Sequence, residues 1–202
     1  CGYFFGKENI QFRECKKAKL KGTLYQDHRR SMSRFDLRKN PGVIGKIKKW
    51  SGCKHTISFK EFMQHYHGEL QFGNCTGCDY MKGEDIDIIG TPHIPDWIYK
   101  LFAYTIGCKF DTEAHIKPGL TVEHNGWRFR FTTYGDETLK AIQFYIIESQ
   151  LEQAVGRARL LRETCRVNLY SNFPLCQAIM KELEYDNDRN EYEAKNESER
   201  PD

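Results

Sequence analysis

The sequence predicts an α/β protein with a mostly parallel sheet flanked by helices and one inserted antiparallel β-hairpin. Short β-rich segments alternate with helical segments along the chain, a pattern typical of βαβ units. Residues 85–91 (DIDIIGT) are apolar enough to form a strand buried on both faces, as strands of parallel sheets are. Residues 120–131 (LTVEHNGWRFRF) interrupt this alternation, because Asn125-Gly126 separates two arms of alternating apolar residues.

The composition is that of a globular protein. The chain has 202 residues, of which 39% are hydrophobic and 29% charged, enough for one domain with a core. No run approaches the roughly 18 apolar residues needed to cross a bilayer, and no signal peptide is visible, so no membrane partner is expected. The eight cysteines, without a secretory signal, are expected to be reduced thiols in the cytoplasm. Because the first residue is Cys1 and not Met, we expect a piece of a longer protein.

The net charge of +3 conceals a strong asymmetry. Residues 1–60 hold sixteen Lys and Arg against four Asp and Glu, whereas residues 181–202 hold nine acids against four bases. A basic block of this size is typical of nucleic-acid binders, and a merely solvated face is the alternative. The acidic segment 181–202 is expected to be a disordered tail.

The first quarter of the chain predicts one strand and two short helices. Residues 19–26 alternate apolar and polar side chains, as a half-buried strand does. Ser31 or Ser33 is suited to cap a helix that Asn40-Pro41 ends, and a second short helix follows as far as Trp50.

The rest of the chain continues the alternation of strands and helices. Strands are expected at residues 55–60, 68–74, 85–91 and 165–171, and helices at 61–67, 96–107, 137–161 (with a break) and after Pro174. The hairpin insertion is expected over residues 118–134. The turn at residues 134–138 (YGDET) is typical of a helix cap.

One segment, residues 151–162 (LEQAVGRARLLR), carries the most specific pattern. Gln153, Gly156 and Arg157 give Q-x-x-G-R, followed by Arg159 and Arg162. A glycine inside a helix costs about 1 kcal/mol relative to alanine, so it calls for a reason. An amphipathic helix with a solvated basic face is the plainer alternative, and Gly156 argues against it.

This segment resembles motif VI of superfamily 2 helicases, the Q-x-x-G-R-x-x-R signature of their second RecA-like lobe. The resemblance covers roughly residues 20–176 and is closest to helicases of phages and mobile elements. It implies that residues 19–180 form a RecA-like C-terminal lobe, and that residues 1–18 are a basic lead-in from a missing upstream lobe.

The resemblance also implies roles for the segment's residues. The arginines would stabilise the γ-phosphoryl group of ATP held with Mg²⁺ by the first lobe, Gln153 would orient the attacking water, and Gly156 would allow close approach. The second arginine of the family pattern falls at Leu160, between Arg159 and Arg162, so only Arg157 is assigned firmly and the second finger stays open.

Other segments match the family less specifically. Residues 72–95 resemble the motif V region, which implies that Gly77 and Asp79 face the ATP cleft and that Thr91 lies near the nucleic-acid backbone or the interlobe surface. Residues 56–62, including Lys60, resemble motif IV and imply a second backbone contact. DNA is favoured over RNA as the nucleic-acid partner.

The hairpin adds a third possible contact with nucleic acid. Arg128 and Arg130 alternate with Trp127 and its aromatic neighbours, so one face is basic and the other apolar. Stacking of an unpaired base on an aromatic side chain contributes roughly 1 to 3 kcal/mol, which suits a strand-separating pin. An apolar face packed against its own domain is the alternative.

Two other functions stay open. Residues 40–49 (NPGVIGKIKK) are not a P-loop, so the chain alone is not expected to hydrolyse ATP. A non-catalytic nucleic-acid-binding module is one alternative, and a nuclease or primase using Asp85, Asp87 and Asp136 is the other. No metal site is expected at Cys75-Thr-Gly-Cys78, because two further ligands are lacking nearby.

Overall fold

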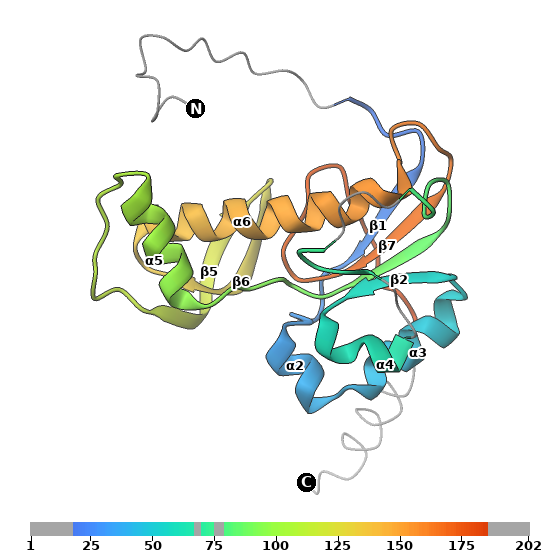
Figure 1. The fold of residues 1–202 in the computed structure, drawn as a ribbon, viewed down its shortest axis with the longest axis horizontal. Coiled ribbons are helices and arrows are strands. Elements are labelled where there is room, and N and C mark those ends of the chain that lie inside the picture. The colour runs from blue at the N-terminus through green and yellow to red at the C-terminus, as the bar shows by residue number, and fades with distance from the viewer. Residues whose placement is uncertain (1–17, 67–69, 75–78, 186–202) are drawn as a thin grey trace, which may run out of the picture.

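The chain folds as the predicted α/β class, with a six-stranded parallel sheet flanked by helices and a separate two-stranded antiparallel sheet (Figure 1). The computed structural model describes residues 18–66, 70–74 and 79–185. This architecture is consistent with a RecA-like fold that carries a hairpin. The predicted fold class is therefore confirmed.

The main sheet has the order β3-β2-β4-β7-β1-β8, and every neighbouring pair in it is parallel. Its strands are β1 (Thr23–Asp27), β2 (His55–Ser58), β3 (Leu70–Gln71), β4 (Ile86–Ile89), β7 (Arg166–Tyr170) and β8 (Ile179–Met180). All four residues of β4 are buried, as its apolar sequence predicted. The two edge strands have only two residues each, which leaves little exposed backbone for unwanted pairing.

Helices cover both faces of this sheet. The helices are α2 (Arg34–Lys39), α3 (Gly42–Ser51), α4 (Met63–Tyr66), α5 (Asp96–Thr105) and α6 (Glu137–Val155), with 3₁₀ turns η2 (Lys60–Phe62) and η3 (Gly156–Ala158). Of these, α5 packs on α6 and the end of the hairpin and not on the main sheet. One core cluster joins the strands to α6, and a second joins β4 and β7 to α2, α3 and α4. The layers are therefore α6 on one face and the three short helices on the other (Figure 1).

The predicted hairpin consists of β5 (Ile116–His124) and β6 (Trp127–Tyr134). Asn125 and Gly126 both have positive φ, 50° and 79°, as a type I′ turn requires. The apolar face of the hairpin is packed on α6, where the Phe131 and Phe144 rings lie 5.7 Å apart edge to face. The apolar face therefore packs against its own domain, which was the alternative to a strand-separating pin.

Several local signals hold at the level of single residues. The Ser33 hydroxyl accepts a hydrogen bond from the Asp36 amide at the start of α2, and Asn40 ends that helix before Pro41. Asp136 caps α6 by accepting from the Leu139 amide at 2.8 Å. These caps act within one turn of helix, so the sequence indicated both helix starts, and the structure decides for Ser33 over Ser31.

One prediction of secondary structure is wrong, and a second is confirmed only in part. No helix follows Pro174 in the described part of the chain: the residues turn and then add β8 as an edge strand beside Tyr25 and Gln26 of β1. The helix predicted over 137–161 has its expected break after Val155, but the break places Gly156 at the start of the tighter 3₁₀ turn η3 and not inside an α-helix. Strand β8 depends on pairing with the distant β1, which the local sequence does not reveal. The sequence also does not show where the α-helix changes to a 3₁₀ turn.

Candidate functional site at the amino edge of the sheet

The predicted motif VI glycine and arginines lie in a loop at the amino edge of the parallel sheet, and Gln153 lies in the last turn of α6 before it. We call residues 156–162 the arginine loop. The Leu160 carbonyl accepts hydrogen bonds from the Lys21 and Gly22 amides at 2.8 and 2.9 Å, just before β1, and the Ala158 carbonyl accepts from the Gly83 amide at 3.2 Å, just before β4. The loop therefore spans the starts of the central strands before it enters β7.

Arg159 is joined to Asp79 across this edge. Its Nη2 lies 2.8 Å from Asp79 Oδ1, and both side chains are exposed. The hydrogen bond and charge of Arg159, helped by the charge of Arg157, lower the pKa of Asp79. The structure thus brings together two residues that the sequence analysis had assigned separately to the motif VI and motif V regions.

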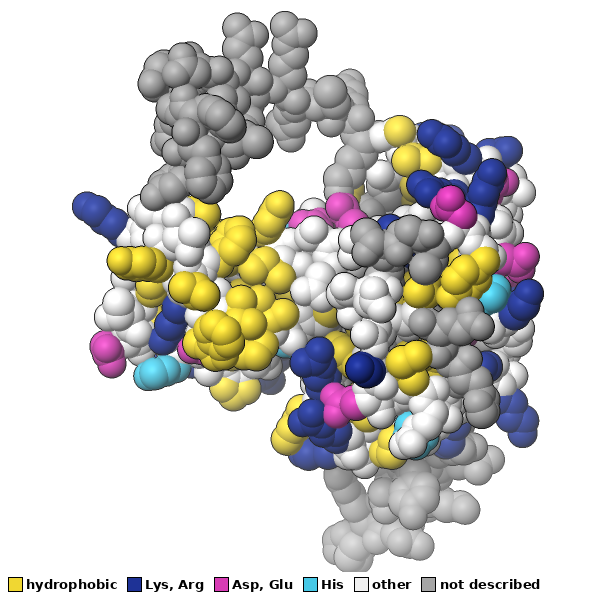
Figure 2. Space-filling view, viewed as in Figure 1, with side chains coloured by type: hydrophobic (Ala, Val, Ile, Leu, Met, Phe, Trp, Pro, Cys, Tyr) yellow, Lys and Arg dark blue, Asp and Glu magenta, His cyan; other side chains and the backbone are white. Residues whose placement is uncertain are grey.

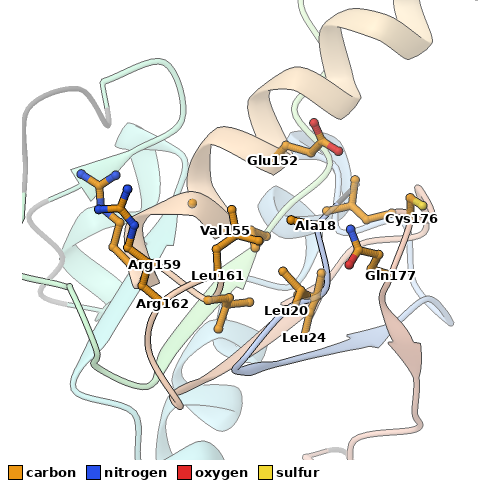
Figure 3. A pocket seen from close by; sticks show the side chains of 13 residues that line it. Ala18, Leu20, Leu24, Glu152, Val155, Arg159, Leu161, Arg162, Cys176 and Gln177 are labelled. Atoms are coloured by element: carbon orange, nitrogen blue, oxygen red, sulfur yellow. The ribbon is translucent and has the colours of Figure 1, made fainter. Parts of the chain in front are cut away.

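The remaining arginines of the loop stand near this pair. The half-buried Arg157 donates from Nε to the Gln153 carbonyl at 3.4 Å, one turn back along the chain. Gln153 and Arg162 are exposed, and Arg159 and Arg162 extend toward the same side in Figure 3. Among the described residues Arg162 forms no ion pair, so its guanidinium is available to an external anion.

Gly156 is exposed, and a Cβ built on it would meet nothing within 4 Å. Nothing in the described chain therefore requires glycine at this position. The open space in front of its backbone leaves room for a molecule from outside, which is the role that the resemblance gives this glycine.

A glycine that the sequence analysis missed fixes the position of the loop. A Cβ on Gly22 would lie 2.5 Å from the Cys165 carbonyl oxygen and 2.7 Å from the Glu163 carbonyl oxygen. Real Cβ atoms do not approach backbone that closely, so only glycine lets the start of β1 pass beneath the arginine loop. A lone glycine ahead of a strand carries no sequence signal for this contact.

The residues assigned to nucleic acid lie mostly at the opposite, carboxyl edge. Lys60 follows β2 and is exposed, whereas Thr91 follows β4 and is fully buried. The Thr91 hydroxyl hydrogen-bonds Ser171 Oγ at 2.7 Å and donates to the Ser31 carbonyl. Thr91 therefore joins three loops within the fold and does not present its side chain at the surface.

The tip of the hairpin reaches the same carboxyl edge. Trp127 is 41% exposed, and its ring lies 5.7 Å from that of His28, which follows β1. With the exposed Arg128, these two residues help to line a small hollow of about 160 Å³. Trp127 and Arg128 are thus placed beside the ends of strands, where open parallel sheets commonly bind ligands.

The hairpin tip is held down and does not project. The Asn125 side-chain amide donates to Glu148 Oε1 at 2.9 Å and to the Pro174 carbonyl at 3.0 Å. Arg130, farther along β6, donates to the Gly119 carbonyl at 3.2 Å within the hairpin. An exposed Trp127 on a fixed support is suited to contact a strand, but not to reach far into a duplex.

Basic side chains gather near this carboxyl edge. Helix α2, which follows β1, carries Arg34, Arg38 and Lys39, and Figure 2 shows the dark blue patch over it. Glu61 neutralises part of this charge, since its carboxylate lies 2.8 Å from Arg38 Nε. Part of the positive charge of residues 1–60 therefore forms an exposed basic patch on α2.

The three carboxylates of the nuclease alternative are separated and have structural partners. Asp85 accepts from the Arg166 amide at 2.7 Å, and Asp136 caps α6. Asp87 is fully buried in β4, where Asn168 Nδ2 and the Ser51 hydroxyl donate to it and burial raises its pKa. Within the described ranges, no group of three metal-ligating side chains is found.

Gly77 and both cysteines of the C-x-x-C pattern lie outside the described residues, as do nearly all of the lead-in 1–18 and most of the tail 181–202. Across the part of the chain that is described, no helix is both long and apolar enough to cross a membrane. Comparison of the chain with protein-family models, curated proteins and solved structures finds no match. The fold thus defines an α/β protein with one group of candidate site residues at each edge of its parallel sheet.

Proposed function

We propose that this chain is the second motor lobe of an ATP-dependent nucleic-acid helicase or translocase, acting in the cytoplasm. The observation that carries the proposal is the separation of the two predicted residue groups. The arginine loop and Asp79 lie at the amino edge of the sheet, whereas Lys60, Trp127 and Arg128 lie at the carboxyl edge. A motor lobe needs separate surfaces for nucleotide and nucleic acid, so that both are bound at once.

At the amino edge, the arginines would meet a triphosphate that a first lobe supplies together with Mg²⁺. A guanidinium is permanently charged and presents a planar fork of donors to phosphate oxygens. Arginine fingers of this kind contribute on the order of 10³ to 10⁵ in rate. Arg157 is the first finger, and Arg162 suits the second better than Arg159, because Asp79 already engages Arg159.

At the carboxyl edge, basic and aromatic side chains would hold one strand of nucleic acid, DNA in preference to RNA. Lys60, Arg128 and the arginines of α2 would contact phosphates, and Trp127 would stack on a base. Such binding is largely independent of sequence and weakens steeply with salt.

The experiment that tests this function uses the chain joined to its first lobe. Arg157→Ala should lower the ATPase kcat by about 10³, and Lys82→Ala, a cation at the same edge paired with Glu163 at 3.7 Å, should leave it near the wild-type value. A non-catalytic nucleic-acid-binding module, which the basic surface also supports, requires equal rates for wild type and Arg157→Ala. Equal rates would therefore show that the chain is the nucleic-acid-binding module and not a motor lobe.

A further inference from the structure

A pocket of about 480 Å³ opens directly beside the arginine loop (Figure 3). Its walls are mainly aliphatic, from Leu20 and Leu24 at β1, Val155 at the end of α6, Leu160, Leu161 and Leu175. Gly156, Arg159 and Arg162 line the same pocket. Its volume falls within the range of about 300 to 1,000 Å³ typical of small-molecule sites, which are mostly apolar with a few placed polar groups.

Two polar residues of the pocket have an unusual backbone conformation. Arg159 has φ 60° and Gln177 has φ 69°, and they are two of the four non-glycine residues with positive φ in the described chain. This left-handed region costs an ordinary residue free energy, and such residues concentrate at ligand sites. Arg159 and Gln177 both line this pocket, so the fold places these two polar side chains there at a cost in stability.

The charged side chains that line the pocket are Arg159, Arg162 and Glu152, so two positive charges stand against one carboxylate, and with Gln177 they are suited to an anionic ligand with a planar polar edge. The Gln177 amide, a donor and an acceptor, has no hydrogen-bond partner in the described part of the chain, and Arg162 forms no ion pair there. In Figure 3 the two guanidiniums lie on one side of the leucines, and Gln177 lies on the other. A ligand spanning the pocket would place its apolar body on leucine and its charge at the arginines.

We infer that this pocket holds the base of a purine nucleotide whose phosphates lie against Arg162, while Arg159 beside them keeps its ion pair with Asp79. Leucine side chains pack against a flat heterocycle, the Gln177 amide matches the donors and acceptors of its edge, and Gly156 leaves the way open to the phosphates. The inference rests on the proposed function for the identity of the phosphate ligand. It adds that this lobe binds the base as well, and so has measurable affinity for nucleotide alone.

The chain carries its own probe of this site, since Cys176 lines the pocket and is exposed. Cys108 is also exposed, but it follows α5, and α5 packs beside the start of α6, at the end of that helix opposite the arginine loop (Figure 1). The rate at which N-ethylmaleimide modifies each thiol is measured by mass spectrometry on the 202-residue chain. ATP at about ten times its Kd should slow modification of Cys176 about tenfold by mass action and leave Cys108 unaffected.

Adenosine and inorganic tripolyphosphate separate the base from the phosphates. Adenosine, at a higher concentration, should also protect Cys176, whereas tripolyphosphate should protect it much less. The inference is overturned if neither ATP nor adenosine protects Cys176, or if tripolyphosphate protects it as well as ATP does. Gln177→Gly provides a second check, because glycine tolerates φ 69° and the variant should fold while losing at least several-fold in affinity.

The two proposals fail independently. If adenosine protects Cys176 but Arg157→Ala leaves the two-lobe ATPase unchanged, the base pocket stands and the motor function fails. If Arg157→Ala abolishes hydrolysis but Cys176 is not protected, the motor function stands and the base lies elsewhere.

Discussion

Arg159 and Asp79, eighty residues apart in the sequence, are joined by an ion pair with 2.8 Å between Nη2 and Oδ1. The pair connects the loop after α6 with the segment leading to β4, both at the amino edge of the sheet. In the proposed motor, this ion pair would fix the backbone conformation of Arg159. It would thereby orient the side chains of Arg157 and Arg162 in the same loop.

Asp79→Asn should therefore lower the ATPase activity of the two-lobe protein without unfolding it. The substitution removes the negative charge that orients Arg159, but both side chains are exposed, so the melting temperature should not change. Steady-state kinetics should show a fall in kcat. Glu84→Gln, an exposed acid in the same segment, is the matched control, and an equal fall in both variants would contradict a specific role for Asp79.

Gly22→Ala should destabilise the fold by about 1 to 3 kcal/mol, the usual cost of overpacking. The new methyl group would collide with the Cys165 and Glu163 carbonyl oxygens, which are backbone atoms and cannot turn aside. Denaturant unfolding measures the loss. Gly156→Ala is the control, since its methyl group meets nothing, and it should be as stable as the wild type yet reduce ATPase activity. Equal stabilities of the two variants would refute this account of Gly22.

His93 should make the protein sensitive to acid. Burial lowers the pKa of His93 to about 4 from an ordinary 6.5, and its ring stacks on Phe131 at 5.1 Å. Because the folded-state pKa is the lower one, the neutral ring favours folding above pH 6.5, and this stability is lost as the pH falls toward 4. The loss is on the order of 3 kcal/mol, at about 1.4 kcal/mol per pKa unit.

Unfolding free energies measured between about pH 7 and pH 4 would check this prediction. His93→Gln should flatten the dependence on pH in that window, whatever its effect at neutral pH. The exposed His115 is the control, and His115→Gln should retain the wild-type slope. An unchanged slope in His93→Gln would assign the acid sensitivity to other groups.

Asp87→Asn should leave the protein as stable at neutral pH or make it more stable, whereas Asp87→Ala should cost about 1 to 3 kcal/mol. Burial raises the pKa of Asp87, so its ionisation opposes folding above the ordinary carboxyl pKa near 3.8. Asparagine can still bond to Asn168 and Ser51 and removes the buried charge, but alanine takes away the carboxylate acceptor and leaves Asn168 only its long contact with the Cys53 sulfur. The advantage of asparagine in denaturant unfolding should shrink in acid, at about pH 4.

Trp127→Ala and Arg128→Ala should weaken binding of single-stranded DNA, whereas Arg162→Ala, at the opposite edge, should not. The loss for Trp127→Ala should be about 1 to 3 kcal/mol, as expected for one stacked base. Arg128→Ala should also reduce the slope of log K against log salt by about one, because the variant neutralises one phosphate fewer. Fluorescence anisotropy across a salt series measures both, and equal losses in all three variants would show that the two edges are not separate surfaces.

The sequence by itself determined the features that act over a few residues. These are the caps at Ser33 and Asp136, the hairpin turn at Asn125-Gly126, the all-buried strand β4 and the alternation that makes the fold α/β. Each depends on hydrogen bonds or periodicity within one or two turns of chain, so composition and spacing were enough. The same local pattern singled out Gln153, Gly156 and the arginines as a set.

Only the tertiary structure decided what these residues face. Strand order placed the arginine loop beside Asp79 and above Gly22, buried Thr91 among three loops, and made residues 179–180 an edge strand in place of a helix. It also divided the predicted site residues between two edges of one sheet. Such contacts join segments separated by tens of residues, and the order in which parallel strands assemble, which no local pattern encodes, determines which segments meet.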